Sequence, residues 1–115
     1  MDFINRIELR GRVGSISIRK AGETRCARVK LATDYYYKGR DGGAVVDTTW
    51  HNLVIWDSRT GARIDEIKSG DCLHIYGRLR TDKYTTDEGE EKYSTEIVVA
   101  KAALEEEDLV PRRDF

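Results

Sequence analysis

Apolar and polar residues alternate with a period of two along most of this chain of 115 residues. The alternation recurs in five segments, near residues 6–10, 27–31, 50–56, 73–80 and 93–99. Because successive side chains of a strand point to opposite faces, this pattern is typical of strands that bury one face. The sequence therefore predicts an all-β domain.

Two turn-rich stretches, 38–43 and 86–90, lie between strand-like segments and predict the tips of two long hairpins. Glycine also occurs inside two of the strand patterns, at Gly11 and Gly77. Glycine within a strand suits the sharp bends of a small closed barrel.

Residues 59–68 predict a short helix, because Ile64 and Ile67 lie three apart and Ser69-Gly70 follows as a stop. Asp57 or Ser58 is a candidate for its N-cap. Three strands, a helix and two further strands are the order of a five-stranded Greek-key OB-fold barrel, with a generic small β-barrel as the alternative. We expect this domain to span residues 1–103, followed by a short, acidic, flexible tail over 104–115.

Charge is unevenly distributed, although the formal net charge is only −1. Residues 1–40 contain ten Lys or Arg and four acids, whereas residues 84–115 contain four basic and ten acidic side chains. Such a chain can present a basic face to phosphates, or the charges can simply be the solvated faces of strands. The N-terminus lacks the pattern of a signal peptide, and Cys26 and Cys72 do not form a disulfide framework, so we expect a cytoplasmic location.

Aromatic side chains occur beside cations. Trp50 and Trp56 lie six apart in one predicted strand and therefore share a face with Asn52, opposite the predicted core residues Leu53 and Ile55. Aromatic platforms interleaved with Lys and Arg are what single-stranded nucleic acid requires, because bases stack on the rings while cations contact the phosphates. The alternative is that these aromatics fill a second small core or an oligomer interface.

Six segments in order, from Asn5 to about Val99, resemble the bacterial single-stranded DNA-binding protein family. They are Asn5-Arg6-Ile7 with Gly11, Leu31-Ala32-Thr33, Thr49-Trp50-His51-Asn52-Leu53-Val54, Lys68-Ser69-Gly70, Tyr76-Gly77-Arg78-Leu79-Arg80-Thr81 and Lys92-Tyr93-Ser94-Thr95-Glu96-Ile97-Val98. The resemblance implies sequence-independent binding and protection of single-stranded DNA in replication, recombination and repair. It also implies a homo-oligomer, either a dimer or a tetramer, and a bacterial nucleoid-associated or phage or mobile-element origin.

The resemblance also implies roles for individual residues. The four positions on which the family stacks bases are all aromatic here, and the matching cations would contact phosphate, while His51 matches a residue at a subunit interface. The implied stacking residues are Tyr37, Trp50, Trp56 and Tyr84, and the implied phosphate contacts are Arg6, Arg19, Lys38, Arg40, Arg80 and Lys83.

The chain also departs from the family pattern. Asp82 and Asp57 stand where a cation and a glycine are common, and Glu8 and Arg10 replace apolar residues of the first strand that help to pair subunits. The Gly/Pro/Gln-rich linker of the family is missing, although the acidic end of the chain, which finishes in Phe, is a candidate for docking replication or repair proteins. The alternative function is therefore a primosomal-type OB-fold module that mainly binds proteins and binds single strands weakly.

Enzymatic signals are missing from the sequence. Cys26, His51, Cys72 and His74 lack the spacing of a metal site, and no phosphate-binding glycine loop or nucleophile motif occurs. We therefore expect no catalysis, no metal and no cofactor, and we expect no membrane association because no long apolar run is present.

Overall fold

Five long strands make up most of the computed structural model, which describes residues 2–57 and 63–106. The strands are β1 (Ile7–Ala21), β2 (Thr24–Lys38), β3 (Ala44–Trp56), β4 (Cys72–Thr85) and β5 (Glu91–Glu105). They close into a barrel in the order β1-β2-β3-β5-β4, in which β3 and β5 pair in parallel and the other neighbours are antiparallel. The predicted all-β, five-stranded OB-fold barrel is therefore confirmed.

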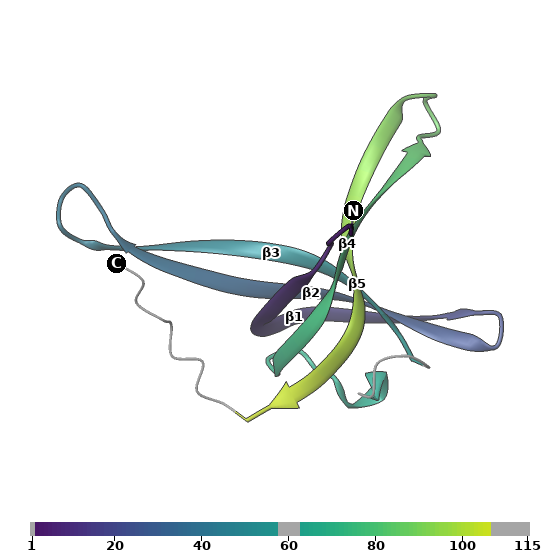
Figure 1. The fold of residues 1–115 in the computed structure, drawn as a ribbon, viewed down its shortest axis with the longest axis horizontal. Coiled ribbons are helices and arrows are strands. Elements are labelled where there is room, and N and C mark those ends of the chain that lie inside the picture. Colours follow the sequence, from purple (N-terminus) through teal and green to yellow (C-terminus); the bar gives the residue numbers. More distant parts are fainter. Residues whose placement is uncertain (1, 58–62, 107–115) are drawn as a thin grey trace.

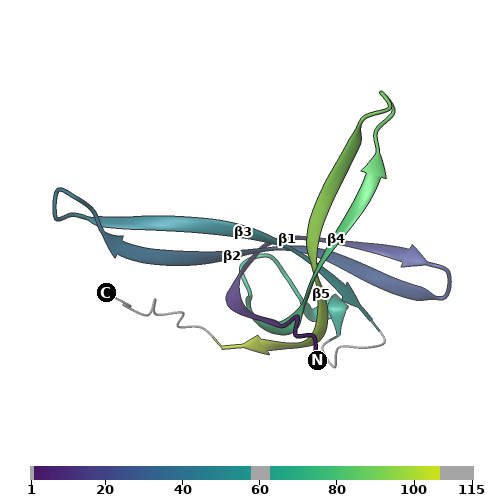
Figure 2. The same ribbon diagram turned by 45° about the horizontal axis from the view of Figure 1, so that its top comes forward.

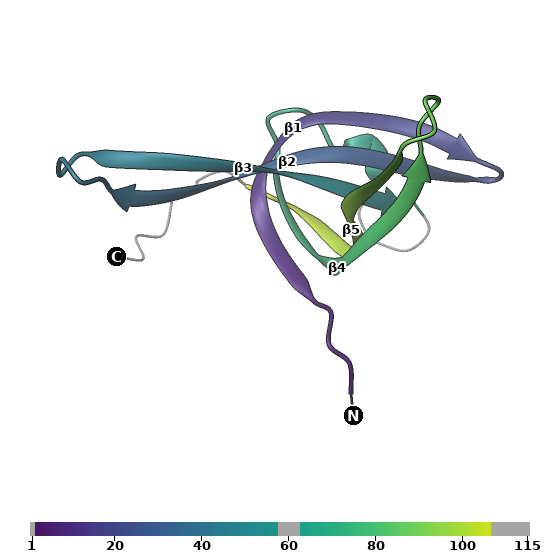
Figure 3. The same ribbon diagram turned by 90° about the horizontal axis from the view of Figure 1, so that it is seen from above.

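The strands extend beyond the barrel as three two-stranded arms (Figure 1). In that view the β2–β3 arm points left, the β1–β2 arm points right and the β4–β5 arm points upward, and the other two views keep this arrangement (Figures 2 and 3). The β2–β3 and β4–β5 arms turn within residues 39–43 and 86–90, so the two predicted hairpin tips are confirmed. Because β2 pairs with β1 at one end and with β3 along its length, it belongs to two arms.

The core is formed by the inward-facing half of each alternating pattern. Leu53 and Ile55 of β3 are buried, as the sequence predicts, and they pack with Leu31, Leu73 and Ile75 of the neighbouring strands. Burial of such side chains stabilises the fold by about 1.5–3 kcal/mol each. The barrel therefore holds β3 with Leu53 and Ile55 inward and with Trp50 on the opposite, outer face.

Two glycines permit close approach between strands. A Cβ atom on Gly11 would overlap the carbonyl oxygen of Ala32, and one on Gly77 would overlap the carbonyl oxygen of Val98. Gly77 also lies where the β4–β5 register shifts, between Tyr76 and Gly77. Both glycines thus lie where a neighbouring strand comes too close for a side chain, which is a second reason, besides the predicted bends, for glycine inside a strand.

The predicted helix over residues 59–68 is wrong for the part of it that the structure describes. A single 3-10 turn, η1 (Ile64–Glu66), is present, and Ile67 is already extended with φ −81° and ψ 124°. Ile64 and Ile67 are both buried. Their spacing of three therefore arises because both side chains of a single turn pack into the core, and not because they lie on one face of a longer helix. The candidate cap Ser58 lies outside the described residues, and Arg63, at the N-cap of η1, makes no side-chain capping hydrogen bond.

Strand β5 continues to Glu105, two residues beyond the expected end of the domain at 103. Most of the expected acidic tail, residues 107–115, lies outside the described residues. Within the described part of the chain, no helix has the length and apolar character needed to cross a membrane.

Candidate nucleic-acid interface

One outer face of the barrel carries both tryptophans. The β2–β3 register pairs Trp50 with Ala32 and Trp56 with Cys26, and because side chains alternate, both indoles point away from the buried Leu53 and Ile55. Trp50 has 57% of its surface exposed, and Trp56 is half-buried. The prediction that they share a face is confirmed.

Cations from β2 border this face. Arg28 and Lys30 point to the same side as the indoles, because Arg28 pairs with Val54 and Lys30 pairs with Asn52. Both are exposed. The sequence-based site omitted them, although the alternation that placed Trp50 and Trp56 also places Arg28 and Lys30.

Trp56 lies where two grooves meet. The first, which we call the Trp56 groove, runs between the β1–β2 arm and the β4–β5 arm. It is lined by four cations and two acids around apolar side chains that include Val54 and Val98; the charged residues are Arg19, Lys20, Arg28, Arg80, Asp82 and Glu96. The predicted phosphate contacts Arg19 and Arg80 are thus brought together around one indole.

The second groove, the N-terminal groove, is lined by Trp56, Arg6 and Arg78 together with Asn5 and Val98. Asn5 fixes its wall, because its amide donates to the Leu79 carbonyl at 2.8 Å and its Oδ1 accepts the Leu79 N–H at 2.9 Å. This pair of hydrogen bonds holds the segment before β1 against β4. Arg6, a predicted phosphate contact, thereby lines the same groove as Trp56, and Arg78 joins it.

Trp50 lines a separate hollow with Gly14, Ser15, Lys30 and Asn52. Gly14 sits at the point where the β1–β2 register shifts, between Val13 and Ser15. A Cβ atom on Gly14 would overlap the six-membered ring of Trp50. The missing side chain at position 14 therefore allows the six-membered ring of Trp50 to approach β1 closely.

Replacing Gly14 by Ala should move the indole of Trp50 without unfolding the barrel, because the exposed ring can swing away. In a Trp56→Phe background, where Trp50 is the one remaining tryptophan, we expect a changed emission maximum and an unchanged urea midpoint. Affinity for oligo(dT) should fall about fivefold, part of the 1–3 kcal/mol that one stacked base contributes. Identical emission and affinity before and after the change would contradict this role for Gly14.

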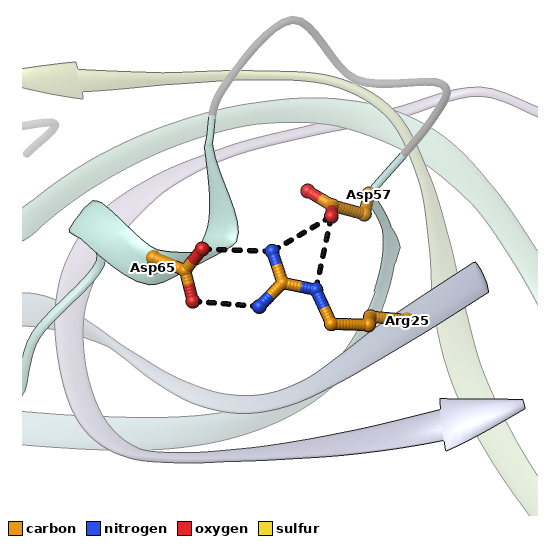
Figure 4. Close-up of polar contacts among 3 residues, drawn as sticks. All are labelled: Arg25, Asp57 and Asp65. Carbon is orange, nitrogen blue, oxygen red and sulfur yellow. Dashed lines mark hydrogen bonds and ion pairs between the residues drawn. The ribbon is translucent and has the colours of Figure 1, made fainter. Parts of the chain in front are cut away.

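Arg25 ties the end of β3 to the η1 turn (Figure 4). Its guanidinium donates to Asp57 Oδ2 from Nε at 3.2 Å and from Nη2 at 2.8 Å, and it binds both oxygens of Asp65 at 2.8 and 2.7 Å. These bonds lower the pKa of the Asp65 carboxyl and raise the pKa of Arg25. Asp57, which directly follows Trp56, is therefore paired, so its charge opposes phosphate binding less than its sequence position predicts.

Stability should fall in acid partly because the Asp65–Arg25 pair is lost. The pKa of Asp65 is lower in the folded chain than its ordinary value near 3.9, so its contribution is complete above that value and disappears as pH falls through the folded pKa. Urea midpoints of the wild type and Asp65→Asn should differ at pH 6 and converge toward pH 2–3. Parallel curves over this range would contradict the assignment.

On the β4–β5 arm the predicted site residues Tyr84 and Lys83 point to opposite faces. Arg80 pairs with Glu96 and Tyr84 pairs with Lys92, which places both on the face of this arm that carries Val98. Tyr84 is 48% exposed there. Lys83 points to the opposite face of this arm, where its Nζ lies 3.0 Å from Glu91 Oε2.

On the β2–β3 arm the register separates Tyr37 from the tryptophans. Tyr37 pairs with Val45 and belongs to the opposite face of the arm from Trp50, where its ring lies 6.1 Å from that of Tyr35. Lys38 pairs with Ala44 and shares the face of Trp50, and Arg40 lies in the turn. The register thus places Trp50, Trp56 and Lys38 on one face of the β2–β3 pair and Arg80 and Tyr84 on one face of the β4–β5 arm. Tyr37 and Lys83 lie on the reverse faces of these two arms.

His51 lies on the inner face of β3, opposite Leu31, and its Nε2 is 2.8 Å from the hydroxyl of Thr33. Burial lowers the pKa of this imidazole. The half-buried His51 therefore has a partner within its own chain.

The first-strand residues Glu8 and Arg10 also find partners on β4 and β5. His74 bridges two carboxylates, with Nε2 2.6 Å from Glu8 Oε2 and Nδ1 2.8 Å from Glu105 Oε1. Arg10 Nη1 lies 3.5 Å from Glu105 Oε2. Hydrogen bonds from Tyr76 and His74 lower the pKa of Glu8. Among the described residues, no group of three or more His, Cys, Asp or Glu is arranged to hold a metal ion.

Comparison with known sequences gives one consistent result. Residues 4–104 match the profile of the "Single-strand binding protein family". The chain is 37% identical over 97 residues to the single-stranded DNA-binding protein of Xanthomonas axonopodis pv. citri, covering 83% of this chain and 54% of that protein. The corresponding protein of Rhizobium meliloti is 31% identical over 100 residues, covering 84% of this chain and 58% of that protein. The chain thus spans rather more than half the length of these relatives.

Solved structures are similar in fold. A Plasmodium falciparum SSB in complex with ssDNA superposes with a TM-score of 0.75 at 27% identity, covering 90% of this chain and 95% of that chain. The single-stranded DNA binding protein from Thermus aquaticus, solved as a deletion mutant, gives a TM-score of 0.76 at 17% identity, covering 90% of this chain and 51% of that one. The second similarity concerns the fold alone.

Proposed function

This chain belongs to the single-strand binding protein family, and we propose that it binds single-stranded DNA through the outer face that carries Trp50 and Trp56. Binding is independent of base sequence, because every base has a π-face that can stack on an indole. The Plasmodium falciparum relative solved with ssDNA supports this assignment.

The observation that carries the proposal is the position of Trp56 between two grooves lined by cations. Arg19, Arg28 and Arg80 line the Trp56 groove, and Arg6 and Arg78 line the N-terminal groove. A base stacked on Trp56 would therefore have cations on either side for its phosphates. Stacking contributes roughly 1–3 kcal/mol per base, and the cations add a salt-dependent term.

The path of a bound strand follows from the exposed aromatics. In this proposal, successive parts of the DNA strand would contact Trp50 with Lys30, Trp56 with its two grooves, and Tyr84 on the β4–β5 arm. Tyr37, Arg40 and Lys83 would contact the same strand if it passes around the edges of the β2–β3 and β4–β5 arms. Lys38, which shares the face of Trp50, would contact the strand without such a detour.

The cellular role that suits such binding is protection of exposed strands in replication, recombination and repair, without catalysis. We further propose a cytoplasmic homo-oligomer, with His51 near the subunit interface, as the family resemblance implies. The acidic end of the chain, from Glu105 to Phe115, would dock replication or repair proteins.

Titration of the intrinsic tryptophan fluorescence with oligo(dT) tests the proposal. We expect quenching that saturates at a fixed number of nucleotides per chain and weakens as salt rises, because the phosphate contacts release counterions. The experiment should compare low and moderate salt, with double-stranded DNA of equal length as a control.

Unquenched emission from folded protein would contradict the proposal, because it would mean that protein rather than DNA covers the two indoles. The primosomal-type interaction module would then be the better description. Circular dichroism in the same samples verifies that the protein is folded.

A further inference from the structure

Two of the cations in the Trp56 groove are already occupied by carboxylates of the same chain. Arg28 of β2 donates from Nη1 to Glu96 Oε2 of β5 at 2.9 Å, across the intervening strand β3. Arg80 donates from Nε to Asp82 Oδ1 at 3.2 Å, and its Nη2 lies 3.1 Å from Asp82 Oδ2. The free protein therefore already supplies the groove with internal anions.

The carboxylates of Glu96 and Asp82 differ in how much they are exposed to solvent. The side chain of Glu96 is 13% exposed, whereas that of its partner Arg28 is 57% exposed. The side chains of Asp82 and Arg80 are 48% and 49% exposed. If Arg28 moved to a phosphate, the enclosed carboxylate of Glu96 would lose its partner and gain little water, which is unfavourable. Asp82 can be solvated when Arg80 leaves it.

We propose that Glu96 and Asp82 are built-in competitors of the DNA backbone, which reduce both the affinity for single strands and its salt dependence. This inference rests on the proposed function. A phosphate must displace the carboxylate from Arg28 or Arg80, or bind without that cation. In both cases fewer counterions are released when the DNA binds. Glu96 reduces the affinity more than Asp82 does, because its carboxylate is the more enclosed.

The test compares Glu96→Gln and Asp82→Asn with the wild type, in full-length protein near neutral pH. The probe is a labelled oligo(dT) longer than about 16 nucleotides, the upper site size of one OB fold. We expect each variant to bind about two- to fivefold more tightly at low salt. The slope of log K against log salt should become steeper by up to about 0.7, which corresponds to one additional phosphate contact on a single strand.

Tighter binding could result from release of Arg28 or Arg80 from its carboxylate, or simply from the change in net charge. A double-mutant cycle distinguishes these two causes. The gain from Glu96→Gln should disappear when Arg28 is replaced by Ala, and the gain from Asp82→Asn should disappear in Arg80→Ala. Glu66→Gln is the matched charge control, because Glu66 is an exposed residue of η1 that does not line the Trp56 groove.

Equal or weaker binding by both variants would overturn the inference, and so would a gain that persists in the Arg→Ala backgrounds or appears equally in Glu66→Gln. If Glu96→Gln does not fold, Asp82→Asn still decides the question, because Asp82 is a half-buried residue of the arm that is not part of the core. These outcomes leave the proposed function intact, whereas failure of the wild type to bind oligo(dT) would reject the function itself.

Discussion

Replacing Trp50 and Trp56 together by Ala should weaken oligo(dT) binding by more than about 30-fold, or about 2 kcal/mol, because two stacking surfaces are lost. Both side chains lie on the outer face of β3, opposite the buried Leu53 and Ile55, so their removal leaves the core packing in place. The double variant contains no tryptophan. Its binding is therefore measured by the anisotropy of a labelled oligo(dT).

Tyr93→Ala provides the matched control. Tyr93 is 69% exposed, and it pairs with Lys83 on the reverse face of the β4–β5 arm. Its removal should cost much less affinity than the loss of the two tryptophans. Wild-type affinity in the double tryptophan variant, with an unchanged thermal transition, would exclude stacking on these two residues.

Replacing Gly77 by Ala should destabilise the barrel by about 3 kcal/mol or prevent folding, because backbone overlap cannot be relieved by a side-chain rotation. The added Cβ would meet the carbonyl oxygen of Val98, where β4 crosses β5 at the register shift. The urea midpoint of the purified variant measures the loss. Recovery of the variant only from the insoluble fraction agrees with the same prediction.

Gly43→Ala is the control for the general effect of adding a methyl group to glycine. Gly43 lies at the tip of the β2–β3 arm, and the nearest atom to its added Cβ is Asp41 Oδ1 at 3.3 Å. We expect a small change in its urea midpoint. Similar midpoints for Gly43→Ala and Gly77→Ala would show that the strand crossing tolerates a side chain, contrary to our interpretation.

The strands could be predicted from the sequence because period-two alternation is a local signal. Leu53 and Ile55 are buried and Trp50 is exposed, as the alternation requires. The helix was wrongly predicted because a spacing of three between Ile64 and Ile67 is satisfied equally by a single 3-10 turn. No local pattern distinguishes one buried turn from the start of a longer helix.

The site was only partly predictable, for a related reason. Alternation identifies the two faces of each strand, and it therefore also contains the information that Lys83 and Tyr84 point to opposite sides. The pairing of Arg28 with Glu96 joins residues 68 positions apart in sequence. It depends on β5 lying beside β3, which no spacing in the sequence reveals. Ion pairs of this kind set the electrostatics of the groove and become visible only in the folded chain.

The closure of the barrel depends on a narrow seam. Between β3 and β5 the register joins Leu53 to Ile97 and Val54 to Val98, whereas the hairpin partners of these strands are paired along most of their length. Local hairpins form before contacts between segments distant in sequence, because closing a longer loop costs more entropy. The seam should therefore assemble after the β2–β3 and β4–β5 hairpins, and with two register pairs it is the narrowest of the strand pairings that close the barrel. A single-stranded DNA that runs from Arg28 of β2 to Arg80 of β4 would cross this seam. Its binding would therefore stabilise the closed barrel against separation of β3 from β5.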